Sequence, residues 1–211
     1  HRFAQVMCGN MDQTASVFGK VGQVFKFDCR SRETSFHSLN LNDSSLLLVD
    51  TKVKHALAET AYNTRREECE AAVKLIQQSY PEVSSLRDAE YHMINEVGLK
   101  DNLKLRAEFV IEENDRVTKA ELCLDQNDLD GLGELMWESH KGLSQKYKVS
   151  CPELDFIVQH TKNLSYIKGA RMMGGGFGGC CILLIQSSAI MGFKELITTP
   201  FTKAVDAQPE F

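Results

Sequence analysis

Hydrophobic residues recur at two different spacings along the chain, and these spacings predict helices and strands in a definite order. A helix is expected over residues 11–19, with Asn10 as its N-cap. Two short alternating patterns follow, around residues 24–27 and 34–39, and together they predict a β-hairpin. The continuous apolar run at residues 46–49 has the length of a strand. The chain thus begins with one helix and a small amount of sheet.

A block of helices is predicted for the middle of the sequence, where apolar residues lie three and four positions apart. The expected helices span residues 64–78, 85–97, 102–125, 128–147 and 151–161. Two of them begin at an expected capping box, Thr64 with Glu67 and Ser150 with Glu153. Gly98 is expected to close the second helix. A further helix is expected near residues 192–197.

The most constrained stretch is residues 169–185, because five of the six residues from Gly174 to Gly179 are glycine. Each glycine costs roughly 0.5–1 kcal/mol relative to alanine, but permits positive φ and close approach. The run formally matches G-x-G-x-x-G, a fingerprint that requires a following helix. Residues 180–185 instead form an apolar run typical of a buried strand, and residues 166–172 predict another. The loop is therefore either a tight connection within a sheet or a place where another group approaches closely.

Composition narrows the class of protein. The chain has 211 residues, 43% hydrophobic and 25% charged, which is ordinary for one large or two small globular domains. A net charge of −5 with scattered basic residues argues against nucleic acid and anionic membranes as partners. Seven cysteines without a C-x-x-C pair favour a reducing, cytoplasmic compartment. No apolar run approaches the roughly 18 residues of a membrane span.

Few side chains stand out as catalytic candidates. The six histidines show no metal-binding pair at helical spacing, and the G-x-S-x-G nucleophile elbow is absent. Acidic pairs such as Glu112 and Glu113 are typical of solvated helix faces, so no metal ligands are expected. Asp12 differs because it falls in the first turn of a predicted helix, where the helix dipole favours a negative charge. It could orient a hydroxyl proton, or it could simply stabilise the helix start.

Several segments occur in the order found in one enzyme family. Residues 169–180 resemble the third motif of the GHMP small-molecule kinases in its galactokinase form. Residues 8–13 are similar to the galactokinase segment that carries the catalytic aspartate. Four further segments recur in the same order: residues 28–31, 53–55, 62–66 together with Cys69, and 149–155. The resemblance covers nearly the whole chain.

The resemblance implies ATP-dependent phosphorylation of galactose at its anomeric C1 hydroxyl, giving galactose 1-phosphate, in the full-length protein. ATP and Mg²⁺ are the implied cofactors, and galactose and ATP are the implied small-molecule partners. By position, Asp12 corresponds to the catalytic acid, and Gly9, Asp12 and Tyr62 correspond to residues that contact the sugar. The glycines expected near the active site are Gly174, Gly175, Gly176, Gly178 and Gly179.

The implied fold is α+β, which also agrees with helices segregated from a small sheet. Residues 51–211 correspond to the C-terminal GHMP kinase domain, a small, mostly antiparallel sheet packed by a helical block. Residues 1–50 correspond to the end of the N-terminal domain, with the Asp12 helix and the hairpin.

The chain also departs from the family pattern. The first motif, the phosphate-binding loop and the residues that hold magnesium have no counterpart in it, so we expect a fragment lacking roughly the N-terminal half and inactive alone. Met173 stands where threonine is usual, and Asn10 where isoleucine is common. Two alternatives remain: a related GHMP kinase acting on another sugar, or a non-catalytic galactokinase-like sugar sensor. The sequence leaves the oligomeric state open.

Overall fold

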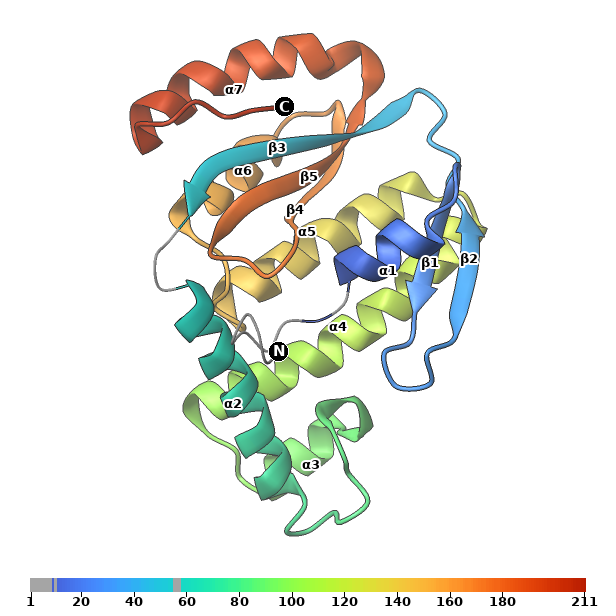
Figure 1. Cartoon of the computed structure of the whole chain (residues 1–211), viewed down its shortest axis with the longest axis vertical. Coiled ribbons are helices and arrows are strands. Elements are labelled where there is room, and N and C mark those ends of the chain that lie inside the picture. The colour runs from blue at the N-terminus through green and yellow to red at the C-terminus, as the bar shows by residue number, and fades with distance from the viewer. Residues whose placement is uncertain (1–8, 10, 55–57) are drawn as a thin grey trace.

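A three-stranded antiparallel sheet and a bundle of helices make up most of the molecule (Figure 1). The computed structural model describes residue 9 and residues 11–54 and 58–211, and of residues 54 and 58–60 it describes the backbone alone. The strands are β1 (Gln23–Phe27), β2 (Thr34–Ser38), β3 (Ser44–Lys54), β4 (Ile167–Met172) and β5 (Gly178–Gln186). The helices are α1 (Met11–Phe18), α2 (Ala58–Ile76), α3 (Tyr91–Glu96), α4 (Asp101–Asp125), α5 (Leu129–Gln145), α6 (Pro152–Thr161) and α7 (Ile190–Val205), with single 3₁₀ turns at Leu86–Asp88 and Ser187–Ala189.

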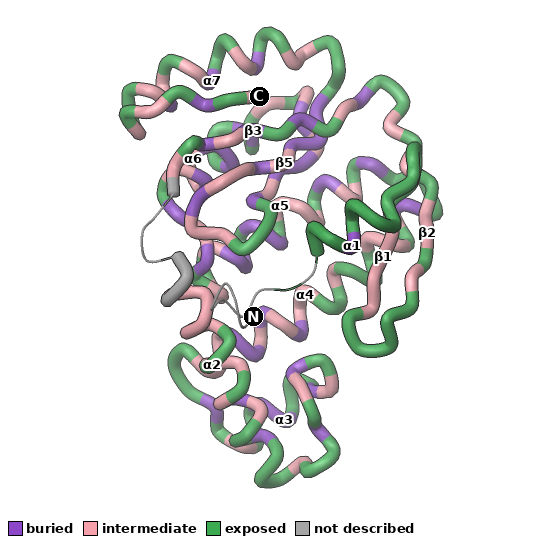
Figure 2. The backbone as a smooth tube through the Cα atoms, viewed as in Figure 1, coloured by how far each residue is buried: buried purple, intermediate pink, exposed green. Residues whose placement is uncertain are grey.

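The main sheet has the order β3-β5-β4, so the strand after the glycine loop lies in the middle. Along β3, apolar residues alternate between a buried and an exposed face, because successive side chains of a strand point to opposite faces. Leu47 and Val49 are buried against α6 and α7, whereas Leu46 and Leu48 on the other face remain 43% and 45% exposed. Figure 2 shows buried positions gathered along β5, while α1 and the hairpin are mostly exposed. The core therefore lies between the sheet and its helices.

Helix α5 approaches β4 so closely that glycine is required on both sides. A Cβ atom on Gly169 of β4 would lie 2.4 Å from the Cα of Gly133 on α5. That distance is far below van der Waals contact, so neither position can carry a side chain without moving the helix. This close contact fixes the position of β4 against α5, and the glycine loop continues from the other end of the strand.

The helical block has a second core, formed where α2, α3 and α4 meet. The β1–β2 hairpin is attached to this block by charged side chains. Arg30 contacts Asp88 at 2.7 Å, and Arg87 pairs with Asp28 in the reverse direction. On the other side Lys26 contacts Glu121 of α4 at 2.6 Å. The hairpin is thus held mainly by polar contacts at its periphery.

The α+β class and the order of elements agree with the sequence-based prediction, but two expected capping boxes were wrong. Helix α2 begins at Ala58, so Thr64 lies inside it. Helix α6 begins after Cys151, and the Ser150 hydroxyl donates to Asp155 instead of capping the helix. Asn10, the expected cap of the first helix, lies outside the described residues.

Two helices differ in extent from their prediction. The helix expected over residues 85–97 is divided into a 3₁₀ turn and α3, although Ser85 and Asp88 do form a capping box. The last helix is longer than expected and continues through Pro200. The expected domain division at residue 50 falls within β3, which pairs with β5; where the N-terminal domain ends stays a prediction.

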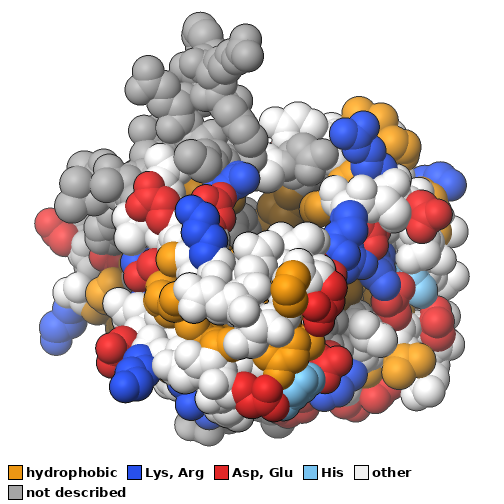
Figure 3. Space-filling model, turned by 90° about the horizontal axis from the view of Figure 1, so that it is seen from below, with side chains coloured by type: hydrophobic (Ala, Val, Ile, Leu, Met, Phe, Trp, Pro, Cys, Tyr) orange, Lys and Arg blue, Asp and Glu red, His pale blue; other side chains and the backbone are white. Residues whose placement is uncertain are grey.

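None of the helices in residues 11–54 and 58–211 is long and apolar enough to cross a bilayer. On the face seen in Figure 3, acidic and basic side chains are interspersed. The six cysteines in the described part of the chain are all free thiols.

Candidate active site

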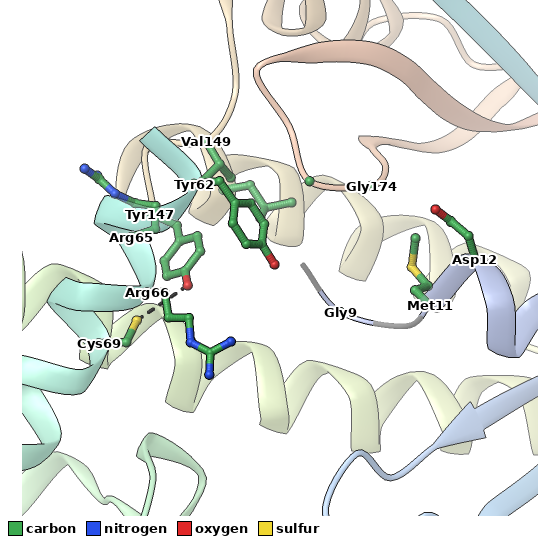
Figure 4. A pocket seen from close by; sticks show the side chains of 12 residues that line it. Gly9, Met11, Asp12, Tyr62, Arg65, Arg66, Cys69, Tyr147, Val149 and Gly174 are labelled. Atoms are coloured by element: carbon green, nitrogen blue, oxygen red, sulfur yellow. Dashed lines mark hydrogen bonds between the residues drawn. The ribbon is translucent and has the colours of Figure 1, made fainter. Parts of the chain in front are cut away.

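A cavity of about 600 Å³ brings together segments that are far apart in the sequence (Figure 4). Its lining residues are Gly9, Met11, Asp12, Tyr62, Arg65, Arg66, Cys69, Leu143, Tyr147, Val149, Gly174 and Gly175. Five predicted site residues are among them: Gly9, Asp12, Tyr62, Gly174 and Gly175. Gly176, Gly178 and Gly179, also predicted, lie further along the loop and do not line it.

Helix α1 carries Asp12 on one side of the cavity. Asp12 is the second residue of the helix, where a carboxylate interacts favourably with the positive end of the helix dipole. Its carbonyl oxygen accepts a hydrogen bond from the Ser16 hydroxyl at 2.9 Å, within the same helix. The residue is exposed, so a ligand in the cavity can reach the carboxylate.

Helix α2 forms the opposite side with Tyr62, Arg65 and Arg66. These residues are three and four positions apart, so they lie on neighbouring parts of one helix face. Tyr62 projects from α2 into the space between α2 and α1 (Figure 4). Arg66 donates from Nε to Glu70 at 3.0 Å. The spacing from Tyr62 could have identified both arginines from the sequence, but we had not predicted them as site residues.

The floor of the cavity is formed by neutral groups. The Cys69 Sγ lies 3.5 Å from the Tyr147 hydroxyl, and the Tyr147 ring stacks on Phe109 with centroids 4.7 Å apart. Burial raises the pKa of the Tyr147 hydroxyl and the pKa of the Cys69 thiol, so both stay protonated at neutral pH. Charge in the cavity therefore comes from Asp12 and the two arginines. No local sequence pattern marks Tyr147, which reaches the site through tertiary packing, whereas Val149 begins the 149–155 segment of the family resemblance.

The glycine loop connects β4 to β5 and forms the third side. Gly174, Gly176, Gly178 and Gly179 all have positive φ, which glycine adopts without strain. A Cβ on Gly176 would lie 2.1 Å from the carbonyl oxygen of Val149, so this position also requires glycine for space. Among the described residues, the amides of Gly174 and Gly175 have no backbone acceptor. Such N–H groups can bind an anion.

The described residues do not fit a dedicated magnesium site. Magnesium prefers octahedral oxygen ligands, commonly one or two carboxylates with substrate phosphates. The cavity lining has one carboxylate, that of Asp12. In residues 9, 11–54 and 58–211, no group of three His, Cys, Asp or Glu side chains is arranged to hold a metal ion.

Comparison with known proteins identifies the domain. Residues 120–190 match the family model described as GHMP kinases C terminal. The chain carries a GHMP kinase C-terminal domain. This identification confirms the family resemblance and the α+β fold that the sequence motifs had suggested.

Several galactokinases are similar to this chain. The galactokinase of Thermotoga maritima is 40% identical over 202 residues, which cover 95% of this chain and 55% of that protein. The galactokinase of Clostridium acetobutylicum is 35% identical over 99% of this chain and 54% of its own length. The crystal structure of Lactococcus lactis galactokinase complexed with galactose superposes with a TM-score of 0.90 at 28% identity, covering 97% of this chain and 53% of that one. The chain thus spans about half the length of the curated relatives it matches.

Proposed function

We propose that this domain, in the complete protein, catalyses the ATP-dependent phosphorylation of galactose at the C1 hydroxyl to give galactose 1-phosphate. The observation that carries the proposal is the cavity itself, where Asp12, Tyr62 and the glycine loop meet. The galactokinase resemblance implied that Asp12 and Tyr62 contact the sugar and that the glycine loop lies near the active site. The similarity to galactokinases, one of them complexed with galactose, agrees with the same substrate.

Asp12 is proposed as the catalytic residue. Its carboxylate would orient the C1 hydroxyl and accept its proton as the hydroxyl oxygen attacks the γ-phosphorus of ATP. The bond from phosphorus to the bridging oxygen then breaks, leaving ADP with the electron pair. The exposed position of Asp12 at the start of α1 leaves room for a hydroxyl beside the carboxylate.

Gly9 and Tyr62 are proposed to bind the sugar. Gly9 offers backbone without a side chain close to Asp12, so a sugar ring can approach it. The Tyr62 ring supplies an apolar surface and its hydroxyl a hydrogen-bonding group, a combination that suits the faces and edges of a hexose. Gly174 and Gly175 would bring backbone N–H groups close to the reacting phosphoryl oxygens.

ATP is the phosphoryl donor that GHMP kinase membership implies. Since the described residues do not fit magnesium, we place the Mg²⁺ ligands in another part of the complete protein, and we expect the 211-residue chain alone to be inactive. A cytoplasmic location also stays a prediction.

A sugar panel on the complete protein tests the substrate. Galactose and N-acetylgalactosamine are each supplied with ATP, and ADP release is followed in a coupled assay. We expect turnover with galactose to exceed that with the other sugar. Preferred turnover of another sugar would assign the protein to a related kinase. Galactose binding by calorimetry without ADP release would favour a non-catalytic sensor.

A further inference from the structure

A buried histidine lies directly behind the glycine loop. His140 of α5 is 6% exposed, and its Nδ1 accepts a hydrogen bond from the backbone N–H of Met172 at 3.1 Å. Met172 is the last residue of β4 and lies two positions before Gly174. On the other side of the ring, Nε2 lies 3.1 Å from Oδ1 of Asp155 in the first turn of α6. The imidazole therefore joins the start of the loop to α6.

These contacts define the tautomer of the ring. Because Nδ1 accepts an N–H, it carries no proton, so the proton lies on Nε2 and is donated to Asp155. The same carboxylate accepts hydrogen bonds from the Ser150 hydroxyl at 2.6 Å and the Ser144 hydroxyl at 2.9 Å. Burial acts to raise the pKa of Asp155, but these three hydrogen bonds outweigh it and lower that pKa. The Asp155 carboxylate therefore stays charged and accepts three hydrogen bonds.

The far end of the loop is attached to the same connection between α5 and α6. The Phe177 N–H donates to the carbonyl oxygen of Val149 at 2.8 Å, and Gly176 packs against that carbonyl. Val149 precedes Ser150, whose hydroxyl reaches Asp155. The contacts therefore close a ring: His140, Met172, the loop to Phe177, Val149 with Ser150, and Asp155. We call this ring the His140 bridge.

We propose that His140 is a positioning residue that, through the His140 bridge, holds the glycine loop at the cavity. The side of the loop facing α2 is close to Tyr62, since a Cβ on Gly175 would lie 3.6 Å from the Tyr62 ring. A shift of the loop would therefore change the cavity wall where the sugar and phosphoryl groups are expected. An apolar residue at position 140 would leave the Met172 N–H without its acceptor and Asp155 without one donor. The kinetic consequence rests on the proposed function; the structural one does not.

Amide hydrogen exchange in the 211-residue chain tests the structural part. We expect His140→Leu to raise exchange at Met172 and Phe177 about tenfold or more over the wild type, because local opening then requires less free energy. His140→Gln can still accept from one N–H and donate to one carboxylate, so it should stay within about threefold. Val158→Ala, at a buried position of α6 outside the bridge, controls for general destabilisation. Equal exchange at the loop in His140→Leu and Val158→Ala at matched melting temperatures would overturn the proposal.

A spectroscopic measurement on the wild type remains informative if His140→Leu fails to fold. Nitrogen-15 shifts of the His140 ring should show protonated Nε2 and unprotonated Nδ1. A proton on Nδ1 would contradict the bridge.

Kinetics in the complete protein form a separate arm. His140→Leu should lower kcat about tenfold and leave the KM for galactose within threefold of the wild type, because misplacing a remote support affects the reacting geometry. His140→Gln should restore at least half of the wild-type kcat. Unchanged kcat in His140→Leu would overturn the positioning role. If the wild type does not turn over galactose, the proposed function is refuted. Amide hydrogen exchange would still test the His140 bridge in that case.

Discussion

Tyr62 is the side chain that meets both the glycine loop and the open space of the cavity. Removing only its hydroxyl in Tyr62→Phe should weaken galactose binding by about 3- to 10-fold, the value of one hydrogen bond. Tyr62→Ala also removes the ring, so the loss should be larger, while the half-buried position predicts little effect on melting. Calorimetric titration of the complete protein with galactose measures the affinity of both Tyr62 variants.

The matched control is Tyr91→Phe, which removes a hydroxyl that donates to Glu112 away from the cavity. Galactose affinity should be unaffected in Tyr91→Phe. Wild-type affinity in both Tyr62 variants would mean that the sugar does not contact this ring.

Two neighbouring glycines of the loop should respond differently to substitution. Gly176 has φ +87° and no space for a Cβ, so Gly176→Ala should destabilise the fold by at least about 1–2 kcal/mol from the left-handed backbone alone. Gly175 has an ordinary φ, and an added Cβ would only touch Tyr62, so Gly175→Ala should fold with a change of about 0.5 kcal/mol or less. Urea unfolding of the 211-residue chain compares the two.

A larger side chain should also separate the two positions. Valine at Gly175 should impair turnover more than folding, whereas valine at Gly176 should impair folding, because the carbonyl of Val149 occupies the space beside Gly176. Equal unfolding free energies for Gly175→Ala and Gly176→Ala would contradict the geometry of the loop.

Among the elements, the hairpin is held to the 3₁₀ turn at Leu86–Asp88 by two crossed ion pairs, and these predict a pH dependence. Hydrogen bonds from Arg87 lower the pKa of Asp28, and those from Arg30 lower the pKa of Asp88, from the ordinary 3.8. A carboxyl with a lower pKa in the folded state contributes stability that is present above its unfolded pKa and is lost as the pH falls. The melting temperature should therefore fall as the pH drops below about 4.

The double variant Asp28→Asn with Asp88→Asn isolates these pairs. Its melting temperature should be lower than that of the wild type at pH 7, and the difference should narrow as the pH falls below 4. Because both carboxyls are near the surface, added salt should also reduce the difference. If the melting temperatures of the two proteins change in parallel from pH 7 to pH 2, the crossed ion pairs do not contribute to the stability of the folded state.

Elements with long apolar periodicity could be predicted, and α4, expected over residues 102–125, was placed to within one residue, but the start of α2 was not. Helices α4 and α5 follow from their apolar stripes, and the strands around the glycine loop follow from their apolar runs. The Thr64 box failed because Ser or Thr with Glu three residues later also occurs inside helices. Residues 58–63 contain neither glycine nor proline, so nothing stops the helix from starting earlier. Such local signals are ambiguous without knowledge of what precedes them.

Only those residues of the candidate site that lie in family motifs could be predicted from the sequence. Asp12, Tyr62 and the glycine loop came from family resemblance, whereas no periodicity places them together. Val149 begins the 149–155 segment of the resemblance, although it was not predicted to line the site. Tyr147 was missed because it follows α5 and reaches the cavity through the packing of that helix against β4 and α4. Tertiary neighbours of this kind have no signature in one sequence.

At the scale of the whole molecule, the cavity lining has one carboxylate, that of Asp12 on α1 (Figure 4). Phosphoryl transfer needs several groups to neutralise phosphate charge. We therefore expect the 211-residue chain, supplied with galactose, ATP and Mg²⁺, to release no ADP above background in a coupled assay. Robust turnover by the purified chain would show that these 211 residues suffice for catalysis.

The central claim is that Asp12 performs the proton chemistry of a galactose kinase, and Asp12→Asn in the complete protein tests it most directly. Asparagine keeps the shape of the side chain but cannot accept the proton, so kcat should fall by about 10²- to 10⁴-fold while the Kd for galactose stays within threefold. Asp115→Asn, on the exposed side of α4, removes the same charge away from the cavity and should leave kcat unchanged. A wild-type kcat in Asp12→Asn would contradict the account.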